Sequence, residues 1–270
     1  HRTTTAWTDG HRVLYHWQRF NGEWLRATLE SNCVYCSSPG TFNDPWDCKP
    51  HFNSEILSDP QEYEKHVNWA VELCRRTTRM SPLDLDRMRR ELMSDRQRAS
   101  ELLNQISDEM APAINSQYRV YCLGPDVRNL LMWAHYADSH MGVCLEFDVA
   151  NETICSALKC DYLSAFPLMK LHDDSDDMVL RILLSKSDVW SYEDEYRLIA
   201  QERAAAAPLT ETLMTDNSLL QLPAGALRAV VTGCRGDHDV VRNLVQRVAP
   251  QVLVRRAVMV PNRYELVIEG

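Results

Sequence analysis

Apolar and polar residues alternate with two different periods along this chain of 270 residues. Short β-prone runs bounded by turn residues indicate strands, and longer stretches with apolar positions three or four residues apart indicate helices. We predict strands over residues 11–18, 33–36, 118–123, 143–147, 158–162, 195–201, 229–233, 252–260 and 264–268. Helices are predicted over residues 22–31, 129–139, 177–186 and 237–248.

A different pattern occupies residues 59–117. Turn residues are scarce there, Arg, Glu, Leu and Met are frequent, and apolar positions such as Val67 and Val71 recur at helical spacing. We interpret this segment as a helical insertion of two or three helices, broken near the Ser81-Pro82 pair, within a single catalytic domain that covers residues 1–270. Strands near both ends and helices between them predict the α+β class.

Composition and charge narrow the kind of partner. The chain carries 29 Lys and Arg against 38 Asp and Glu, a formal net charge of −9, which disfavours nucleic-acid binding by bulk electrostatics. Arg-rich runs at residues 75–79 and 87–90 leave a local basic groove open, although such side chains are often only solvated. With no apolar run of about 18 residues and no secretory h-region in residues 1–10, we expect a cytoplasmic protein with no membrane partner.

Nine scattered cysteines, an odd number, favour reduced thiols over a disulfide framework. Cys33-x-x-Cys36 and Cys48-x-x-His51 have the spacing of zinc ligands. Alternate positions of a strand point to opposite faces, so the two residues of a pair could face apart. We therefore expect no metal, and a zinc site at these residues stays an alternative. The nine glycines form neither a P-loop nor a dinucleotide fingerprint, which argues against a glycine-rich phosphate loop.

Residues 130–148 hold the densest group of polar and aromatic side chains. On the predicted helix, Met132, His135 and Tyr136 share one face, and His140 lies at the turn into the next strand. This arrangement can present a histidine and a tyrosine together to a ligand. The alternative is that the aromatic residues are core and the histidines are partly exposed or bonded to backbone carbonyls.

A second group lies at residues 186–198. In an extended strand, Glu193, Glu195 and Arg197 project to one face. A glutamate held at a strand start can act as a general base or stabilise a developing sugar cation. The alternative is a solvated strand edge with Glu and Arg pairing.

Two further groups lie near the start of the chain. His16, between Tyr15 and Trp17, can hydrogen-bond a ribose or a phosphate, although a histidine at the edge of the core is the more frequent case. Asn43 and Asp44 lie in a turn, where such side chains bond their own backbone and set the loop's shape.

Four segments, in this order, resemble a bacterial family that has carried only an unknown-function label. They are Leu14-Tyr15-His16; Phe42-Asn43-Asp44-Pro45; Leu131-Met132-Trp133-Ala134-His135-Tyr136 running through His140 and Gly142 to Leu145-Glu146-Phe147-Asp148; and Lys186 with Trp190-Ser191-Tyr192-Glu193-Asp194-Glu195-Tyr196-Arg197.

The order of these motifs is also similar to the His-Tyr-Glu arrangement of ADP-ribosyltransferase folds, which occur in bacterial toxins and phage-defence enzymes. The resemblance implies a central split β-sheet and NAD as substrate: His16 would hold the ribose, Tyr136 would stack on nicotinamide, and Glu195 would stabilise the oxocarbenium-like transition state. Glu193 would orient the acceptor, as in a Glu-x-Glu transferase branch. The implied NAD-binding residues are His16, Tyr15, Tyr136, Trp133, His135, His140 and Arg197.

The resemblance leaves the acceptor open, because this chain has a long helical insertion and lacks a clear Ser-Thr-Ser strand. RNA, DNA or protein is the expected acceptor, and a toxic transferase would need an antitoxin or inhibitor protein. Two other functions stay open. One is a metal-independent hydrolase or nuclease that uses His135, His140 and Glu146; the other is a non-catalytic, nucleotide-sensing defence module.

Overall fold

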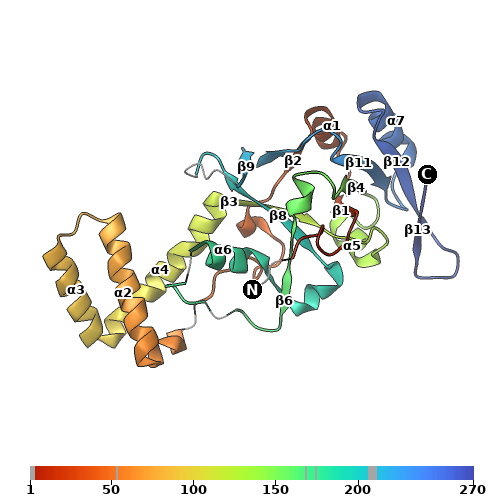
Figure 1. Ribbon diagram of the computed structural model, residues 1–270. Helices are drawn as coiled ribbons and strands as arrows, with labels where there is room; N and C mark the ends of the chain where they lie inside the picture. The colour runs from red at the N-terminus through yellow and green to blue at the C-terminus, as the bar shows by residue number, and fades with distance from the viewer. Residues whose placement is uncertain (1–3, 53, 168, 174, 206–211) are drawn as a thin grey trace.

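The computed structural model describes residues 4–52, 54–167, 169–173, 175–205 and 212–270 (Figure 1). It has two main sheets with helices around them, and a helical block that lies at one end of the molecule. The predicted α+β class is therefore confirmed.

The first sheet has the strand order β1-β4-β11-β12-β13. Its strands are β1 (Val13–Gln18), β4 (Val143–Asp148), β11 (Leu227–Thr232), β12 (Leu253–Met259) and β13 (Leu266–Glu269). All neighbours are antiparallel except β11 and β12, which run parallel because helix α7 (His238–Val248) crosses over between them.

Helices cover this sheet on both faces. Side chains of α1 (Gly22–Ser31) and α7 join one core cluster with Leu14 and Val230. Helix α5 (Leu130–Tyr136) packs against the other face, where Trp133 joins a second cluster with Tyr15 and Trp17. Alternation along β1 thus sends neighbouring side chains into two different cores.

The second sheet has the strand order β2-β10-β9-β8-β3, and β5 also pairs with β8. Its strands are β2 (Cys33–Tyr35), β10 (Leu219–Gln221), β9 (Leu213–Asp216), β8 (Tyr196–Glu202), β3 (Tyr118–Leu123) and β5 (Leu158–Lys159). The two sheets meet where Tyr15 and Gly124 exchange backbone hydrogen bonds of 2.8 Å in both directions.

Three helices occupy the segment interpreted as an insertion. They are α2 (Pro60–Thr77), α3 (Pro82–Ser94) and α4 (Arg96–Gln117), and a 3-10 turn, η2 (Ser54–Ser58), precedes them. Their apolar faces form a separate cluster that includes Val67 and Leu103. Figure 1 shows α2 and α3 away from the sheets, with α4 leading back to β3.

The remaining elements are short and lie around the second sheet. They are η1 (Pro39–Thr41), η3 (Ile154–Ser156), β6 (Asp161–Leu163), α6 (Ser175–Leu184), β7 (Ser185–Ser187) and η4 (Asp188–Glu193). Strands β6 and β7 form a parallel pair. Among the described residues, none of the helices combines the length and apolar character needed to cross a bilayer.

Local sequence signals account for most helix starts. Six residues accept hydrogen bonds from the first backbone amides of their helices, as N-caps do: Asn21, Asp59, Ser81, Asp95, Asn129 and Asp237. The predicted break near Ser81-Pro82 is the start of α3, where Pro82 occupies the first turn.

Some predictions from the sequence differ from the structure. Residues 158–162 form two strands with different partners, because Cys160 between them donates its amide to the carbonyl of Glu195. The helix predicted to reach Lys186 ends at Leu184, and Lys186 lies in β7. The β9–β10 hairpin was not predicted, because its strands are too short to show a period and its turn is Asn217-Ser218, both left-handed.

The turn after α5 packs tightly against the end of β11. A Cβ added at Gly233 would lie 2.2 Å from the carbonyl oxygen of His140, so Gly233→Ala should lower the free energy of unfolding by about 1–3 kcal/mol. Gly22→Ala is the control, since the nearest atom to its Cβ would be 3.9 Å away. Urea unfolding measures both, and equal stability of the two variants would contradict the packing described.

Candidate functional site

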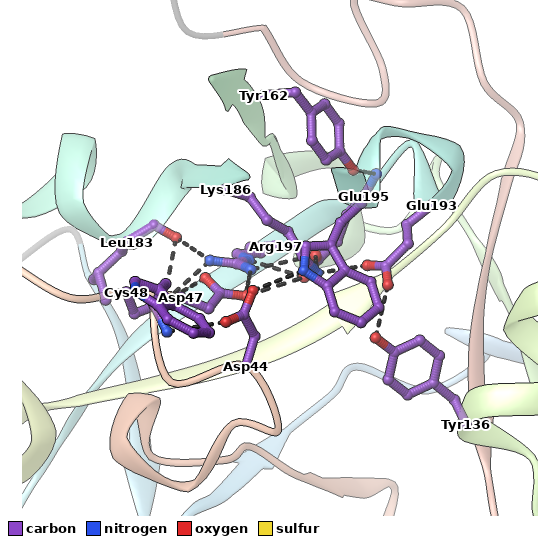
Figure 2. Close-up of polar contacts among 12 residues, drawn as sticks. Asp44, Asp47, Cys48, Tyr136, Tyr162, Leu183, Lys186, Glu193, Glu195 and Arg197 are labelled. Carbon is purple, nitrogen blue, oxygen red and sulfur yellow. Dashed lines mark hydrogen bonds and ion pairs between the residues drawn. The ribbon is translucent and has the colours of Figure 1, made fainter. Parts of the chain in front are cut away.

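A buried lysine connects the acidic residues of the late chain. Lys186 lies in β7, and its Nζ is 2.5 Å from Oε2 of Glu193, 2.6 Å from Oε2 of Glu195 and 3.7 Å from Oδ2 of Asp47 (Figure 2). All four side chains are buried. Lys186 therefore holds three carboxylates from two distant parts of the sequence in one place.

Arg197 of β8 supports the same acids from the protein interior. Its Nε donates to Oε1 of Glu195 at 2.8 Å, and its Nη2 donates to Oδ2 of Asp47 at 2.7 Å. Its Nη1 donates to the carbonyl of Leu183 at 2.6 Å and contacts Sγ of Cys48 at 3.1 Å. Since Arg197 is fully buried and bonded on all sides, it positions the acids and does not reach a ligand.

The two glutamates have different surroundings and different protonation behaviour. Burial raises the pKa of Glu193 above its ordinary value, and Lys186 offsets this only in part. Burial also acts to raise the pKa of Glu195, but the charges of Arg197 and Lys186 outweigh it and hold this pKa low. Two adjacent carboxylates thus differ in their affinity for a proton.

Backbone geometry brings these acids together. Glu193 ends the 3-10 turn η4, and Asp194 adopts a left-handed conformation with φ of 46° before β8 begins. The amide of Glu195 donates to the hydroxyl of Tyr162 at 2.8 Å. The expectation that Glu193, Glu195 and Arg197 share one face of an extended strand is therefore corrected: their side chains converge because the chain turns at Asp194.

Tyr136 joins the cluster from helix α5. Its hydroxyl donates to Oε1 of Glu193 at 2.6 Å, and Asn43 hydrogen-bonds the same hydroxyl (Figure 2 shows the Tyr136–Glu193 bond). Burial, followed by the charge of Glu193, raises the pKa of Tyr136, so it stays a neutral donor. The pairing of Tyr136 with the late glutamates, expected from the motif order, is present in the structure.

A cavity of about 550 Å³ opens beside Lys186. Its walls come from the turn after η1, the loop after β6, and β7 with the start of η4; the lining residues are Asn43, Asp44, Pro45, Trp46, Leu163, Ser164, Ala165, Phe166, Pro167, Ser185, Lys186, Ser187, Val189 and Trp190. Such a volume is in the range of small-molecule sites.

Two tryptophans give this cavity flat apolar surfaces. Trp190 is fixed by a 2.7 Å bond from its Nε1 to Oδ2 of Asp44, and its ring centroid lies 5.6 Å from Nζ of Lys186. Trp46, which has a large apolar side chain, is 62% exposed. Its ring is therefore free to contact a ligand. Lys186 is the residue shared by the cavity and the acid cluster.

His16 is connected to the acid cluster through Cys122. Its Nδ1 donates to the carbonyl of Cys122 at 2.8 Å, and its ring stacks on Tyr121 with centroids 4.2 Å apart. The Cys122 thiol in turn hydrogen-bonds Glu195. His135 lies at the outer edge of the same region, because its exposed ring is 6.4 Å from that of Trp190.

Three other residues that were expected to bind a ligand are instead held by contacts within the protein. Trp133 is fully buried and donates to the carbonyl of Val127 at 2.6 Å, so it anchors α5 and is not accessible to a ligand. Tyr15 is buried and hydrogen-bonds Glu146. His140 lies in a left-handed turn with φ of 69°, and its carbonyl accepts from the amide of Arg235.

The cysteine pairs of zinc-like spacing do not assemble a shared site. Cys33 donates to Gln221 at 3.2 Å, Cys36 is buried directly after β2, and Cys48 contacts Arg197. His51 stacks on Phe166 instead. Within the described part of the chain, these four residues do not form a group with metal-ligating spacing.

Sequence reasoning missed Lys186, Asp47 and Asp44 as site residues. Asp44 was expected only to shape its loop; one oxygen does accept from the amide of Trp46, at 2.9 Å, while the other holds Trp190. The available signal was position in the sequence: Trp46 and Asp47 directly follow the Phe42-Asn43-Asp44-Pro45 motif, and Trp190 lies with Lys186 in the last motif.

Comparison with protein families gives a match over part of the chain. A family model described as "Protein of unknown function (DUF2971)" matches residues 132–198, a stretch that contains Tyr136, Lys186, Glu193 and Glu195. No curated protein matches the chain, and no solved structure matches it.

Removing the central cation should unbalance the buried charges. Lys186→Met leaves Asp47, Glu193 and Glu195 with Arg197 alone, so we expect the free energy of unfolding at pH 7 to fall by about 3–5 kcal/mol. The loss should shrink toward pH 5, since protonation of a carboxylate removes surplus negative charge. Lys159→Met is the control: its pair with Asp194 is half-exposed, so less than about 1 kcal/mol is expected. Equal losses in urea unfolding would contradict the network.

Desolvation of the half-buried His16 ring predicts an acid-shifted titration. Burial lowers the pKa of His16 to about 4, although its bond to Cys122 opposes this. The unfolded chain, with a pKa near 6.5, therefore takes up a proton that the folded chain refuses, and stability falls as the pH drops from about 6.5 to about 4. An NMR titration of the imidazole should give a midpoint near the lower value, and His16→Gln should flatten this part of the stability profile. A midpoint near 6.5 would rule out the burial described.

Proposed function

We propose that the protein transfers ADP-ribose from NAD to an acceptor. The observation that carries the proposal is that Glu193 and Glu195 share one lysine while their pKa values are shifted in opposite directions. Pairs of carboxylates with separated pKa values divide the work at sites where a bond to a sugar is broken.

The environment of each acid suits one role. Glu195, which stays ionised, stabilises the positive charge that develops on the ribose as nicotinamide departs. Glu193, whose pKa is raised, accepts the proton of the incoming nucleophile. The bond between C1′ and the nicotinamide nitrogen breaks with its electrons going to nicotinamide, and the acceptor forms the new bond to C1′.

The cavity supplies the binding surface in this proposal. Trp46 and Trp190 offer faces for stacking an adenine or nicotinamide ring, and Asn43 and the serines beside Lys186 offer hydrogen bonds to ribose. The Tyr136 hydroxyl keeps Glu193 in place and hydrogen-bonds Asn43 of the cavity wall. The acceptor is a macromolecule, RNA, DNA or protein, as the resemblance to toxins and defence enzymes implies.

The arrangement of elements is compatible with an ADP-ribosyltransferase-like split sheet. His16 comes from β1, Tyr136 from the helix packed on that strand, and Glu195 directly precedes β8 of the second sheet. The junction between Tyr15 and Gly124 brings the two sheets together beside these residues.

The hydrolase alternative finds less support. Its three residues have separate neighbours: His135 faces Trp190, His140 lies against the Arg235 turn, and Glu146 accepts from Arg255 at 2.7 Å. A general acid and a general base must both reach the reacting atoms of one substrate. The separate contacts of these three residues do not favour this.

The proposal is tested with labelled NAD and bacterial extract. The wild-type protein should consume NAD and label an acceptor, and Glu195→Gln and Glu193→Gln should each reduce the rate at least a hundredfold. Because Glu193 must be ionised to accept a proton, the rate should also fall as the pH drops through its raised pKa. Glu30→Gln, on the exposed surface of α1, should leave the rate unchanged.

Other results would reject the transferase. Unchanged labelling in Glu195→Gln with an intact fold would remove the assigned acid. Saturable NAD binding by calorimetry without any turnover of the wild-type protein would instead identify a nucleotide-sensing module.

A further inference from the structure

A second group of ligand-type side chains lies away from the acid cluster, where the helical block meets the segment before α6. Glu62 and His66 are one turn apart on α2, and His172 comes from the loop that precedes α6. One potential ligand atom from each lies within 4.8 Å of the others. We propose that these three residues bind a divalent transition-metal ion of the zinc type.

His66 gives the strongest indication of a missing partner. Its side chain is fully buried, and its Nδ1 donates to the backbone carbonyl of Glu62 at 2.7 Å. The proton is therefore on Nδ1, and Nε2 presents a lone pair. Within the described residues, this buried Nε2 has no hydrogen-bond partner. Such an atom requires an explanation, because a buried polar group without a hydrogen bond destabilises the fold.

The neighbouring groups are placed to complete a site. Nε2 of His172 lies 3.0 Å from Oε2 of Glu62, and the rings of His66 and His172 have centroids 4.6 Å apart at 71°. Glutamate and histidine four residues apart lie on the same helix face. Two imidazoles and one carboxylate are a zinc-binding set that leaves a fourth position for water.

The backbone contact of His66 satisfies a further requirement of a metal site. Metal-bound histidines commonly donate their other ring nitrogen to a backbone carbonyl, as His66 does to Glu62.

Two lysines compete with the ion for Glu62. Lys65 and Lys170 contact Oε1 at 2.9 Å and 3.3 Å, whereas Oε2 faces His172. Bound metal therefore uses Oε2 and stays close to two positive charges, which weakens its binding. Removing the charge of Lys170 should consequently raise the metal affinity.

Metal binding here would fasten α2 to the chain between the cavity wall and α6. Residues 163–167 line the cavity, His172 follows a few positions later, and α6 leads directly to Lys186. The ion would act as a clamp between the helical block and the candidate site. This inference does not depend on the identity of the reaction.

The test uses the full chain, freed of metal by a chelator and kept reduced. Calorimetric titration with Zn²⁺ should show one saturable site, and the unfolding temperature should rise with bound metal. His172→Ala and His66→Ala should each weaken binding at least tenfold, whereas Lys170→Gln should strengthen it. His238→Ala is the matched control. His238 contacts Thr232 in β11 of the first sheet, so its loss should leave metal binding unchanged.

Cobalt distinguishes this site from the cysteines. Co²⁺ should give visible bands without the near-ultraviolet absorption of cobalt bound to thiolates. Circular dichroism checks that each variant is folded. His172 is only half-buried, so His172→Ala should keep its fold. The proposal is overturned if the wild-type protein shows no saturable binding, if either histidine variant binds like the wild type, or if thiolate bands appear.

Discussion

The structure depends on keeping three carboxylates and two cations together inside the protein. Asp47, Glu193 and Glu195 carry one negative charge more than Lys186 and Arg197 neutralise. A buried ion is stable only where its partners are held in good geometry, because desolvation costs several kcal/mol per ion. The segments that carry these residues must therefore be rigid. Arg197 meets this need by bonding the carbonyl of Leu183 at the end of α6, and so ties β8 to the helix that leads to Lys186.

The junction of the two sheets serves the same requirement. Tyr15 and Gly124 join β1 to the end of β3, and a Cβ at Gly124 would lie 3.1 Å from the Trp17 ring and 3.2 Å from the carbonyl of Glu193. The absence of a side chain lets three elements approach one another there. Strand β1, which carries His16, and the turn that carries Glu193 are consequently held against the same short piece of backbone. This close approach explains how residues from both sheets reach one site.

Local sequence patterns predicted the elements better than their partners. The bounds of α1 and β3 agree with the prediction because each has a clear period and, for α1, a capping residue, Asn21. Glu193, Glu195 and Tyr136 were expected in the site because of the family resemblance, since their polar motifs alone also fitted a structural role. Asp47 was not expected, since its contact with Arg197 spans 150 positions and depends on the packing of α6 and β8. Periodicity reports which face of an element a residue lies on, but it contains no information on which distant segment covers that face. Trp133 shows the same limit. It was expected to bind a ligand, but it is fully buried and packs in the core.

The position of Lys186 determines how a ligand in the cavity can reach the acids. Glu193 and Glu195 are only 3% and 2% exposed, and Lys186, which lines the cavity, lies against both. An anionic group in the cavity would attract the same Nζ that the carboxylates hold, and the loss of that contact would raise the proton affinity of Glu193 further. Under the proposed function, binding of a phosphate-bearing substrate therefore makes Glu193 a better base as soon as the site is filled. Under that function, the lysine that keeps the acids stable in the free protein is also the residue through which a bound dinucleotide would change their chemistry.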